Sequence, residues 1–239
     1  MRNWLKYRPG LRQYSPLALC AAALLALPAC TGLNQAAINS LQAAYQGPNR
    51  NFEAVPRNPA YQYMQVEVPG AASLTVLGYQ YPNLQVWYAA KGEVVRLQGN
   101  RLLDTTGLNV NLANVQYTQG AQAPQTDARF DVPELGLFNV QATLQLQPTE
   151  PPKSNLAKRA SEQASQQANG GRGLYWYSET FVGALANSKP LPAALEGLPP
   201  AIYGFAQALP EGINASELPP AVYGKQCLAP TYCLEWHRQ

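Results

Sequence analysis

The sequence predicts a mainly β protein, an antiparallel β-sandwich or flattened partial barrel preceded by a short N-terminal helix or tether. Three observations predict this class. Several segments alternate apolar and polar residues with a period of two, short turns rich in Gly and Asn separate them, and branched and aromatic residues concentrate within them. Segments of this kind are typical of short strands, and we expect roughly eight to eleven of them.

The first 29 residues are predicted to be an export signal. Residues 1–16 hold four cations and no acid, and an uncharged run, Leu17–Leu27, follows. This run is shorter than the roughly 20 apolar residues of a membrane-spanning helix. Leu27-Pro28-Ala29-Cys30 resembles the bacterial lipobox, which predicts cleavage before Cys30 and lipid on its thiol. A secreted protein without acylation and an uncleaved membrane anchor are the alternatives, and Cys20 follows a leucine and fits poorly.

Residues 30–48 are expected to form a lipidated tether. Apolar residues recur there at helical spacing between Leu33 and Ala44, and Gly47-Pro48-Asn49 ends the pattern. Residues 49–239 then form one predicted β domain, because the mature part has enough residues for a sizeable core and no second apolar run of membrane-spanning length.

The first half of this domain reads as consecutive strands. In Tyr61–Val68 the even-numbered apolar residues share one face, and glycine-containing turns after residues 89 and 98 indicate an antiparallel meander. The strands expected after Tyr61–Val68 are Leu74–Gln80, Leu84–Ala89, Glu93–Gln98 and Arg101–Thr105.

The clearest predicted strand is Phe138–Gln147. Phe138, Val140, Ala142, Leu144 and Leu146 alternate with polar residues, which predicts that these five side chains form its buried face.

The segment 148–173 is expected to be a flexible excursion, a loop or a loop with one exposed helical piece. It holds three prolines and a stretch rich in Ser, Gln and Asn, a composition that buries little apolar surface. Strand-like sequence resumes at Leu174–Val182. Residues 198–204 then return nearly unchanged as residues 218–224, which we interpret as two similar strand beginnings.

The charge balance argues against a nucleic-acid partner. Four of the 17 basic residues precede Cys30 and none of the 14 acids does, so the mature chain carries 13 cations against 14 acids. Its formal charge is therefore −1, without the basic excess through which proteins neutralise phosphates.

Cys227 and Cys233 are the unmodified cysteines that remain in an exported chain, and they predict a disulfide. The alternative is a zinc site completed by His237. That site has no obvious fourth ligand, and five residues separate its cysteines where two to four are usual. We therefore expect no metal and no cofactor.

The sequence offers few groups for catalysis. It holds one histidine and no phosphate-binding or zinc-protease motif, so we expect no catalytic residues and no enzyme activity. A periplasmic glycan-modifying enzyme that uses two carboxylates is the alternative, since such hydrolysis needs only two acids. The available acids are Glu67, Glu93, Asp104, Asp127, Asp131, Glu134 and Glu179.

Aromatic residues are the enriched feature that suggests binding. Rings with a polar edge stack on sugars and on partner surfaces, although they also fill β cores. Tyr175, Trp176 and Tyr177 are candidate glycan or partner contacts. On a strand the two tyrosines share one face and the tryptophan takes the other.

A resemblance to a known family lies in Tyr61–Val110. Four segments resemble the YjbF/GfcB family of lipoproteins, which is associated with group 4 capsule and exopolysaccharide production. They are Tyr61-x-Tyr63-x-x-Val66, the segment 74–78 Leu-Thr-Val-Leu-Gly, the Trp87-initiated hairpin through Val95 and the segment 99–108 Gly-Asn-Arg-Leu-Leu-Asp-Thr-Thr-Gly-Leu. The match covers about 50 residues, and residues 111–173 match poorly.

The resemblance implies a role and a location more than a mechanism. It implies a lipoprotein anchored through Cys30 to the periplasmic face of the outer membrane, where it binds or scaffolds other proteins of a polysaccharide secretion system. The polysaccharide itself is a further candidate partner. Thr31 agrees with this location, because an aspartate at that position would favour the inner membrane in enteric-type sorting.

Overall fold

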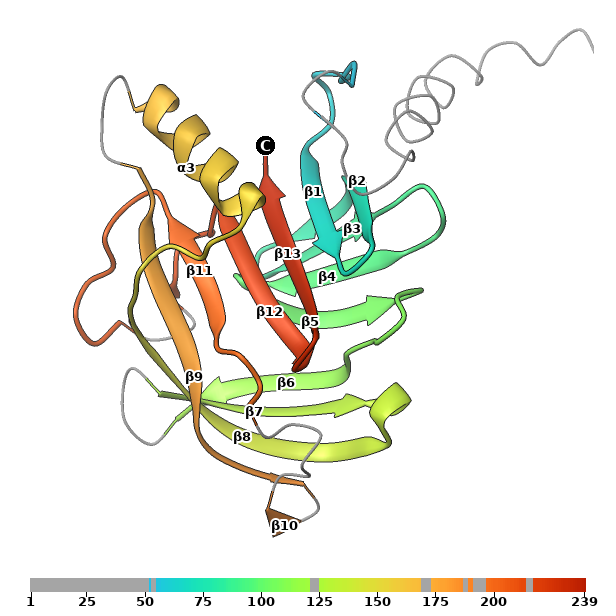
Figure 1. The fold of residues 1–239 in the computed structure, drawn as a ribbon, viewed down its shortest axis with the longest axis vertical. Helices are drawn as coiled ribbons and strands as arrows, with labels where there is room; N and C mark the ends of the chain where they lie inside the picture. Colours follow the sequence, from blue (N-terminus) through green and yellow to red (C-terminus); the bar gives the residue numbers. More distant parts are fainter. Residues whose placement is uncertain are drawn as a thin grey trace, which may run out of the picture. The chain divides into compact units, whose positions relative to one another are not determined.

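The described strands form one antiparallel sheet that curls into a nearly closed barrel (Figure 1). The structure is a computed structural model, which describes residues 52, 55–120, 125–168, 173–186, 189–190, 197–213 and 217–239. The predicted mainly β class is confirmed, as a partial barrel with one α-helix in the described residues. The predicted signal, Cys30 and the tether lie outside the described residues.

The strands in these ranges number 13, more than expected. With the α-helix and a 3-10 turn, the elements are β1 (Tyr63–Val68), β2 (Ala71–Tyr81), β3 (Leu84–Tyr88), β4 (Val94–Gln98), β5 (Arg101–Thr106), β6 (Ala113–Gln119), β7 (Gln125–Val132), η2 (Pro133–Leu135), β8 (Leu137–Pro148), α3 (Asn155–Gln167), β9 (Tyr175–Ala186), β10 (Lys189–Pro190), β11 (Ala201–Phe205), β12 (Tyr223–Ala229) and β13 (Tyr232–Arg238).

The sheet order places the last strand beside the first. Along the sheet the strands run β5-β4-β3-β2-β1-β13-β12-β11-β9-β8-β7-β6, and β10 pairs with β9. The two ends of this path, β5 and β6, approach each other where the Thr105 amide donates to the Leu112 carbonyl (2.9 Å) and the Leu112 amide donates to the Thr105 hydroxyl (2.9 Å). These bonds join the edges in part, and the interior fills with side chains from both halves of the sheet.

The internal repeat supplies two neighbouring strands, as interpreted from the sequence. Its first copy leads into β11 and its second into β12, and these two strands pair antiparallel. Gly224 lies directly opposite Trp236 of β13, and a Cβ on Gly224 would come within 2.1 Å of the indole ring. The second glycine of the repeat therefore lets a fully buried tryptophan lie against the backbone.

The predicted inward face of β8 is correct for four residues and wrong for Phe138. Val140, Ala142, Leu144 and Leu146 are buried, whereas Phe138 is 51% exposed and Leu137 takes the inward position. The cause is local: Asn139 has a positive φ of 53°, and the pairing with β7 shifts register near this point. Such an irregularity reverses the face on which earlier side chains lie.

The predicted excursion contains a helix with a buried face, which differs from the exposed helical piece expected. The Ser154 hydroxyl accepts from the Ala157 amide (3.1 Å) and caps the start of α3. Leu156, Ala157 and Ala160 are buried and pack with Tyr223 of β12, and α3 lies beside β13 (Figure 1). The small side chains of Ala157 and Ala160 let the helix approach the sheet closely. The average composition of residues 148–173 does not reveal these few apolar positions.

Candidate functional site

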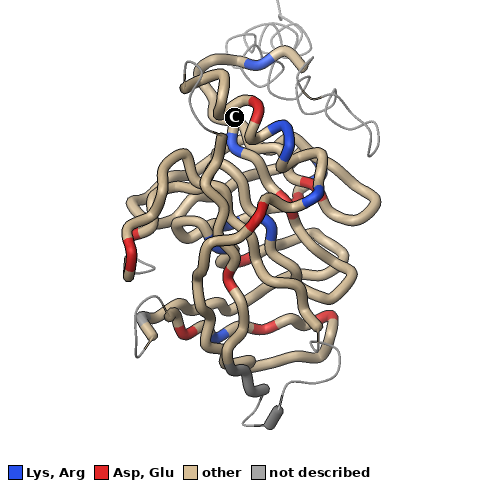
Figure 2. Tube along the Cα trace, turned by 60° about the vertical axis from the view of Figure 1, so that its left-hand side comes forward, with Lys and Arg blue, Asp and Glu red and all other residues tan. Residues whose placement is uncertain are grey.

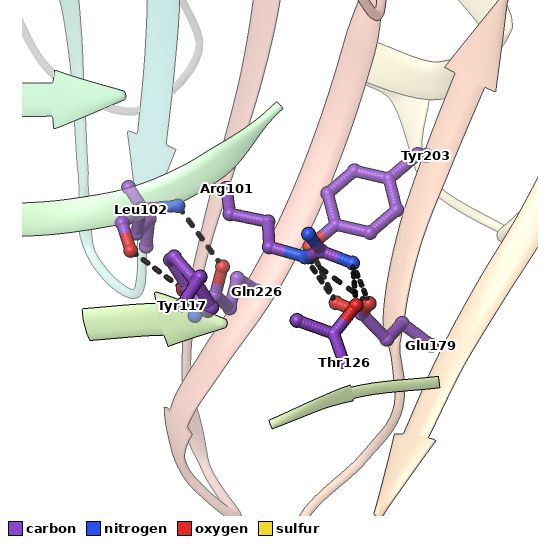
Figure 3. Close-up of polar contacts among 7 residues, drawn as sticks. All are labelled: Arg101, Leu102, Tyr117, Thr126, Glu179, Tyr203 and Gln226. Atoms are coloured by element: carbon purple, nitrogen blue, oxygen red, sulfur yellow. Dashed lines mark hydrogen bonds and ion pairs between the residues drawn. The ribbon is translucent and has the colours of Figure 1, made fainter. Parts of the chain in front are cut away.

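The barrel interior holds a buried ion pair between Arg101 of β5 and Glu179 of β9 (Figure 3). The Arg101 Nε donates to both carboxylate oxygens of Glu179, at 3.1 and 3.0 Å, and Nη2 also contacts this carboxylate. Nη2 donates in addition to the Thr126 hydroxyl of β7 (3.1 Å). One side chain from the end strand of the sheet therefore connects to two strands on the opposite side.

Tyrosines and an amide complete this interior network. The Tyr203 hydroxyl donates to Glu179 (3.3 Å), and the Arg101 guanidinium lies 5.2 Å from the centre of the Tyr117 ring. The Tyr117 hydroxyl donates to the Leu102 carbonyl (2.7 Å), and Gln226 Oε1 accepts from the Leu102 amide (3.2 Å). Figure 3 shows these side chains converging from several strands.

The network is built to hold charge inside the protein. Burial alone would lower the pKa of Arg101, and the adjacent Glu179 carboxylate more than offsets this, so that pKa is raised. Burial, with Glu179 nearby, likewise raises the pKa of Tyr203. The cavity beside the network measures about 40 Å³, room for only a few water molecules. The described side chains of this network therefore join strands, and the cavity beside them is too small for a sugar ring.

The candidate acids are mostly engaged in contacts of this structural kind. Of the seven, only Glu93 has a buried carboxylate oxygen without a hydrogen-bond partner in the described chain, and it lines a cavity of about 40 Å³ with no second acid among its lining residues. The other contacts are Glu67 with Arg159, Asp104 with Arg96, Asp127 with Thr143, Asp131 with the Asn139 amide, Glu134 with Asn111, and Glu179 with Arg101.

The predicted aromatic contacts in β9 lie within the packing of the fold. The Trp176 ring makes an edge contact with Tyr223 (5.2 Å between centroids) beneath α3, and Tyr177 makes one with Phe205 (5.7 Å) on the core side. Tyr175, Trp176 and Tyr177 are all half-buried. The strand does place tyrosine and tryptophan on opposite faces, but these rings serve as internal packing more than as a free surface.

Three of the four exposed aromatic side chains of the described residues lie instead on the β2–β3 hairpin. Tyr79, Tyr81 and Tyr88 are 57, 58 and 38% exposed, and they are three of the five large apolar side chains found exposed in the described residues. We call these three residues the tyrosine face. The rings of Tyr79 and Tyr88 meet edge to face, with centroids 6.3 Å apart.

Gly78 shapes the tyrosine face. A Cβ at this position would lie 2.4 Å from the Tyr88 ring, so only glycine lets the ring rest on the strand. The β2–β3 register also shifts between Leu77 and Tyr79, which marks a bulge here. The sequence contained this signal, a glycine within a strand pattern followed by Tyr79 and Tyr81, but the aromatic contacts predicted at residues 175–177 did not include it.

The C-terminal cysteines are joined. Cys227 and Cys233 form a disulfide across the β12–β13 hairpin, so neither thiolate is free to bind zinc with His237. Within the described ranges, no group of three or more His, Cys, Asp or Glu side chains is arranged to hold a metal ion. No described helix combines the length and apolar character needed to cross a bilayer.

Comparison with known proteins gives a structural likeness and no sequence match. No protein-family model matches the chain, and no curated protein matches it. Among solved structures, the chain is similar to the hypothetical lipoprotein YmcC from Escherichia coli (K12), at 15% sequence identity and a TM-score of 0.43. The likeness covers 95% of this chain and 96% of that chain.

Proposed function

We propose that this protein is a lipid-anchored binding or scaffolding component of surface polysaccharide assembly or export, and that it works without catalysis. The proposal places it on the periplasmic face of the outer membrane, anchored through lipid on Cys30, beside other proteins of the secretion system. The lipobox and the family resemblance of Tyr61–Val110 supply the role and the location. The tyrosine face is the structural observation that carries the binding function.

The tyrosine face suits binding for a physical reason. Tyrosine combines a large flat ring with a polar hydroxyl and few rotatable bonds, so it stacks on sugars or protein surfaces at a low entropic cost. Tyr79, Tyr81 and Tyr88 expose such rings on adjacent strands, within the segment that resembles the lipoprotein family. Figure 2 shows basic and acidic positions interspersed along the described chain.

The state of the acids favours binding over the alternative enzyme. Glycoside hydrolysis uses two carboxylates a few ångströms apart, one of them free to exchange a proton. Six of the seven candidate acids hold ion pairs or hydrogen bonds that join strands or turns, and Glu93 faces its small cavity without a second acid.

The direct test is a double substitution, Tyr79→Ala with Tyr81→Ala, in a strain that lacks the native gene. We expect polysaccharide output to fall by at least about half, because aromatic anchors often contribute about 2 kcal/mol or more each to an interface. Both rings are exposed, so the amount of folded protein should stay unchanged.

Phe138→Ala is the matched control, since Phe138 is a similarly exposed ring on a different strand. Its output should equal that of the native protein. Equal output from the double variant and the control, with equal protein levels, would reject the tyrosine face as the contact surface.

The anchor is tested separately with Cys30→Ser. This change removes the thiol that would carry the lipid, so the protein should be soluble or retain its signal. Mature protein in the outer-membrane fraction of this variant would contradict the proposed anchor.

A further inference from the structure

A second candidate site lies between α3 and the end of β13. It is a pocket of about 600 Å³, lined by Arg57, by Arg159, Glu162 and three glutamines of α3, and by His237 and Gln239. Its volume lies within the range of small-molecule sites, roughly 300–1,000 Å³. It far exceeds the volume of the cavity beside Glu179, about 40 Å³. None of the described lining residues is Phe, Tyr or Trp, so recognition here would depend on hydrogen bonds and charge.

His237 lines the pocket with a buried imidazole whose nitrogens have no hydrogen-bond partner among the described residues. The side chain is 2% exposed. The side-chain oxygen of Gln239 is also buried without a partner there. Buried polar groups are nearly always paired, and leaving one unpaired costs about 1–3 kcal/mol. Two such residues in one wall indicate that the pocket is completed by something that hydrogen bonds.

The charges around the pocket favour an oxyanion. Arg57 forms no ion pair within the described residues and donates only to the Phe52 carbonyl (3.2 Å). Arg159 donates one hydrogen bond to Glu67 (2.9 Å), so most of the five N–H donors of its guanidinium remain available to a ligand. Burial lowers the pKa of His237 most, and the positive charges of Arg159 and Arg57 lower it further, to about 4. The imidazole is therefore neutral at pH 7.

The neighbouring acids are already partly neutralised. Glu67 of β1 also accepts from the Gln65 amide (2.7 Å). In α3, Oε1 of Glu162 lies 3.9 Å from Nζ of Lys158. Glu235, two residues before His237 on β13, forms an ion pair with Lys225 (3.1 Å). The two arginines are therefore the groups best able to meet an incoming negative charge.

We propose that this pocket binds an acidic sugar, with its carboxylate at Arg57 and Arg159 and its hydroxyls at the glutamine amides of α3 and at His237. Guanidinium groups match carboxylates in charge and geometry. Amides and a neutral imidazole both donate and accept, as sugar hydroxyls do. The oxyanion follows from the pocket itself, and the choice of a sugar rests on the proposed function.

The protein carries a built-in reporter of binding, because His237 is its only histidine. The full chain in detergent, labelled at the histidine ring, gives one NMR signal that can be titrated with D-glucuronate and with D-glucose, which lacks the carboxylate. We expect glucuronate to raise the pKa of His237 above about 4 and to bind at least about tenfold more tightly than glucose. Inorganic phosphate in a third titration should bind more weakly than glucuronate.

Substitutions locate the site. Arg57→Gln and Arg159→Gln should each weaken glucuronate binding about tenfold or more, the typical loss for one charge-assisted contact. Arg96→Gln is the matched control, because Arg96 also forms a surface ion pair and is 37% exposed where Arg159 is 34% exposed. The control variant should bind like the native protein.

The outcomes separate the two proposals. No binding of glucuronate, equal binding of glucose, or full binding by both pocket variants would overturn the acidic-sugar site. Phosphate binding as tightly as glucuronate would overturn the sugar assignment. None of these results alters the test of the tyrosine face, which is read from polysaccharide output.

Discussion

The Arg101–Glu179 network inside the barrel and the polar residues beneath α3 differ in how their hydrogen-bonding groups are used. Inside, Arg101 and Glu179 satisfy each other and engage Thr126 and Tyr203. Beneath α3, the equally buried His237 has no partner for either nitrogen in the described chain. A satisfied buried network stabilises a fold, whereas an unsatisfied one beside a cavity suggests a ligand.

The largest expected effect comes from breaking the interior pair. Arg101→Met leaves the Glu179 carboxylate buried without its cation, and we expect the free energy of unfolding to fall by about 3–5 kcal/mol. Urea unfolding followed by circular dichroism measures this loss.

The double variant, Arg101→Met with Glu179→Leu, sharpens the interpretation. Removing both charges leaves no unpaired ion, so most of the lost stability should return. A double variant as unstable as the single one would show that the individual contacts, and not the balance of charge, hold the barrel together.

The second effect concerns pH and the region beneath α3. Burial, together with Arg159 and Arg57, lowers the pKa of folded His237 to about 4, against about 6.5 in an unfolded chain. Between these values the unfolded state binds more protons, so stability is retained above about pH 6.5 and falls as pH decreases toward 4. The loss should reach about 3 kcal/mol.

His237→Gln isolates this contribution, since the acids of the protein titrate similarly in both forms. The native protein should lose more stability than the variant between pH 6.5 and pH 4. Parallel stability profiles for the two proteins would contradict a neutral, buried His237.

The smallest effect is expected from the disulfide. Cys227 and Cys233 are six residues apart, so the bond closes a short loop within a hairpin that is already paired. Replacing both with serine should lower the free energy of unfolding by about 2 kcal/mol in the chain-entropy model. A loss larger than that caused by Arg101→Met would show that this hairpin, and not the interior pair, dominates stability.

The elements that follow local rules were predictable from the sequence. The strands β1 to β5 correspond to predicted segments because alternation and glycine turns act between near neighbours. Strands β6 and β7 were not predicted, although both carry a period-two alternation. Alternate positions of Ala113–Gln119 include Ala, Val and Tyr, and alternate positions of Gln125–Val132 are Thr, Ala, Phe and Val, with polar or charged residues between them. The Phe138 error arose from a single backbone irregularity at Asn139.

The sites depend on contacts that sequence order does not reveal. Arg101 and Glu179 are 78 positions apart, and their meeting requires the register of the whole sheet. The pocket beside His237 likewise combines residues of the N-terminal segment, α3 and β13. Residue types alone identified the acids and aromatics, but only packing separates Trp176 within the fold from Tyr79 and Tyr81 on its surface.

We propose that this protein binds and does not catalyse, and an amide scan of the seven candidate acids is the decisive experiment. Each acid is replaced by its matching amide in a strain without the native gene, and polysaccharide yield, protein level and membrane location are recorded together. We predict near-native polysaccharide yield from every variant that is folded and correctly located. Binding through many contacts spread over a surface does not depend on any single carboxylate. A folded, correctly located variant with no polysaccharide output would contradict the account, since loss of one catalytic acid lowers a rate by about 10²–10⁴-fold.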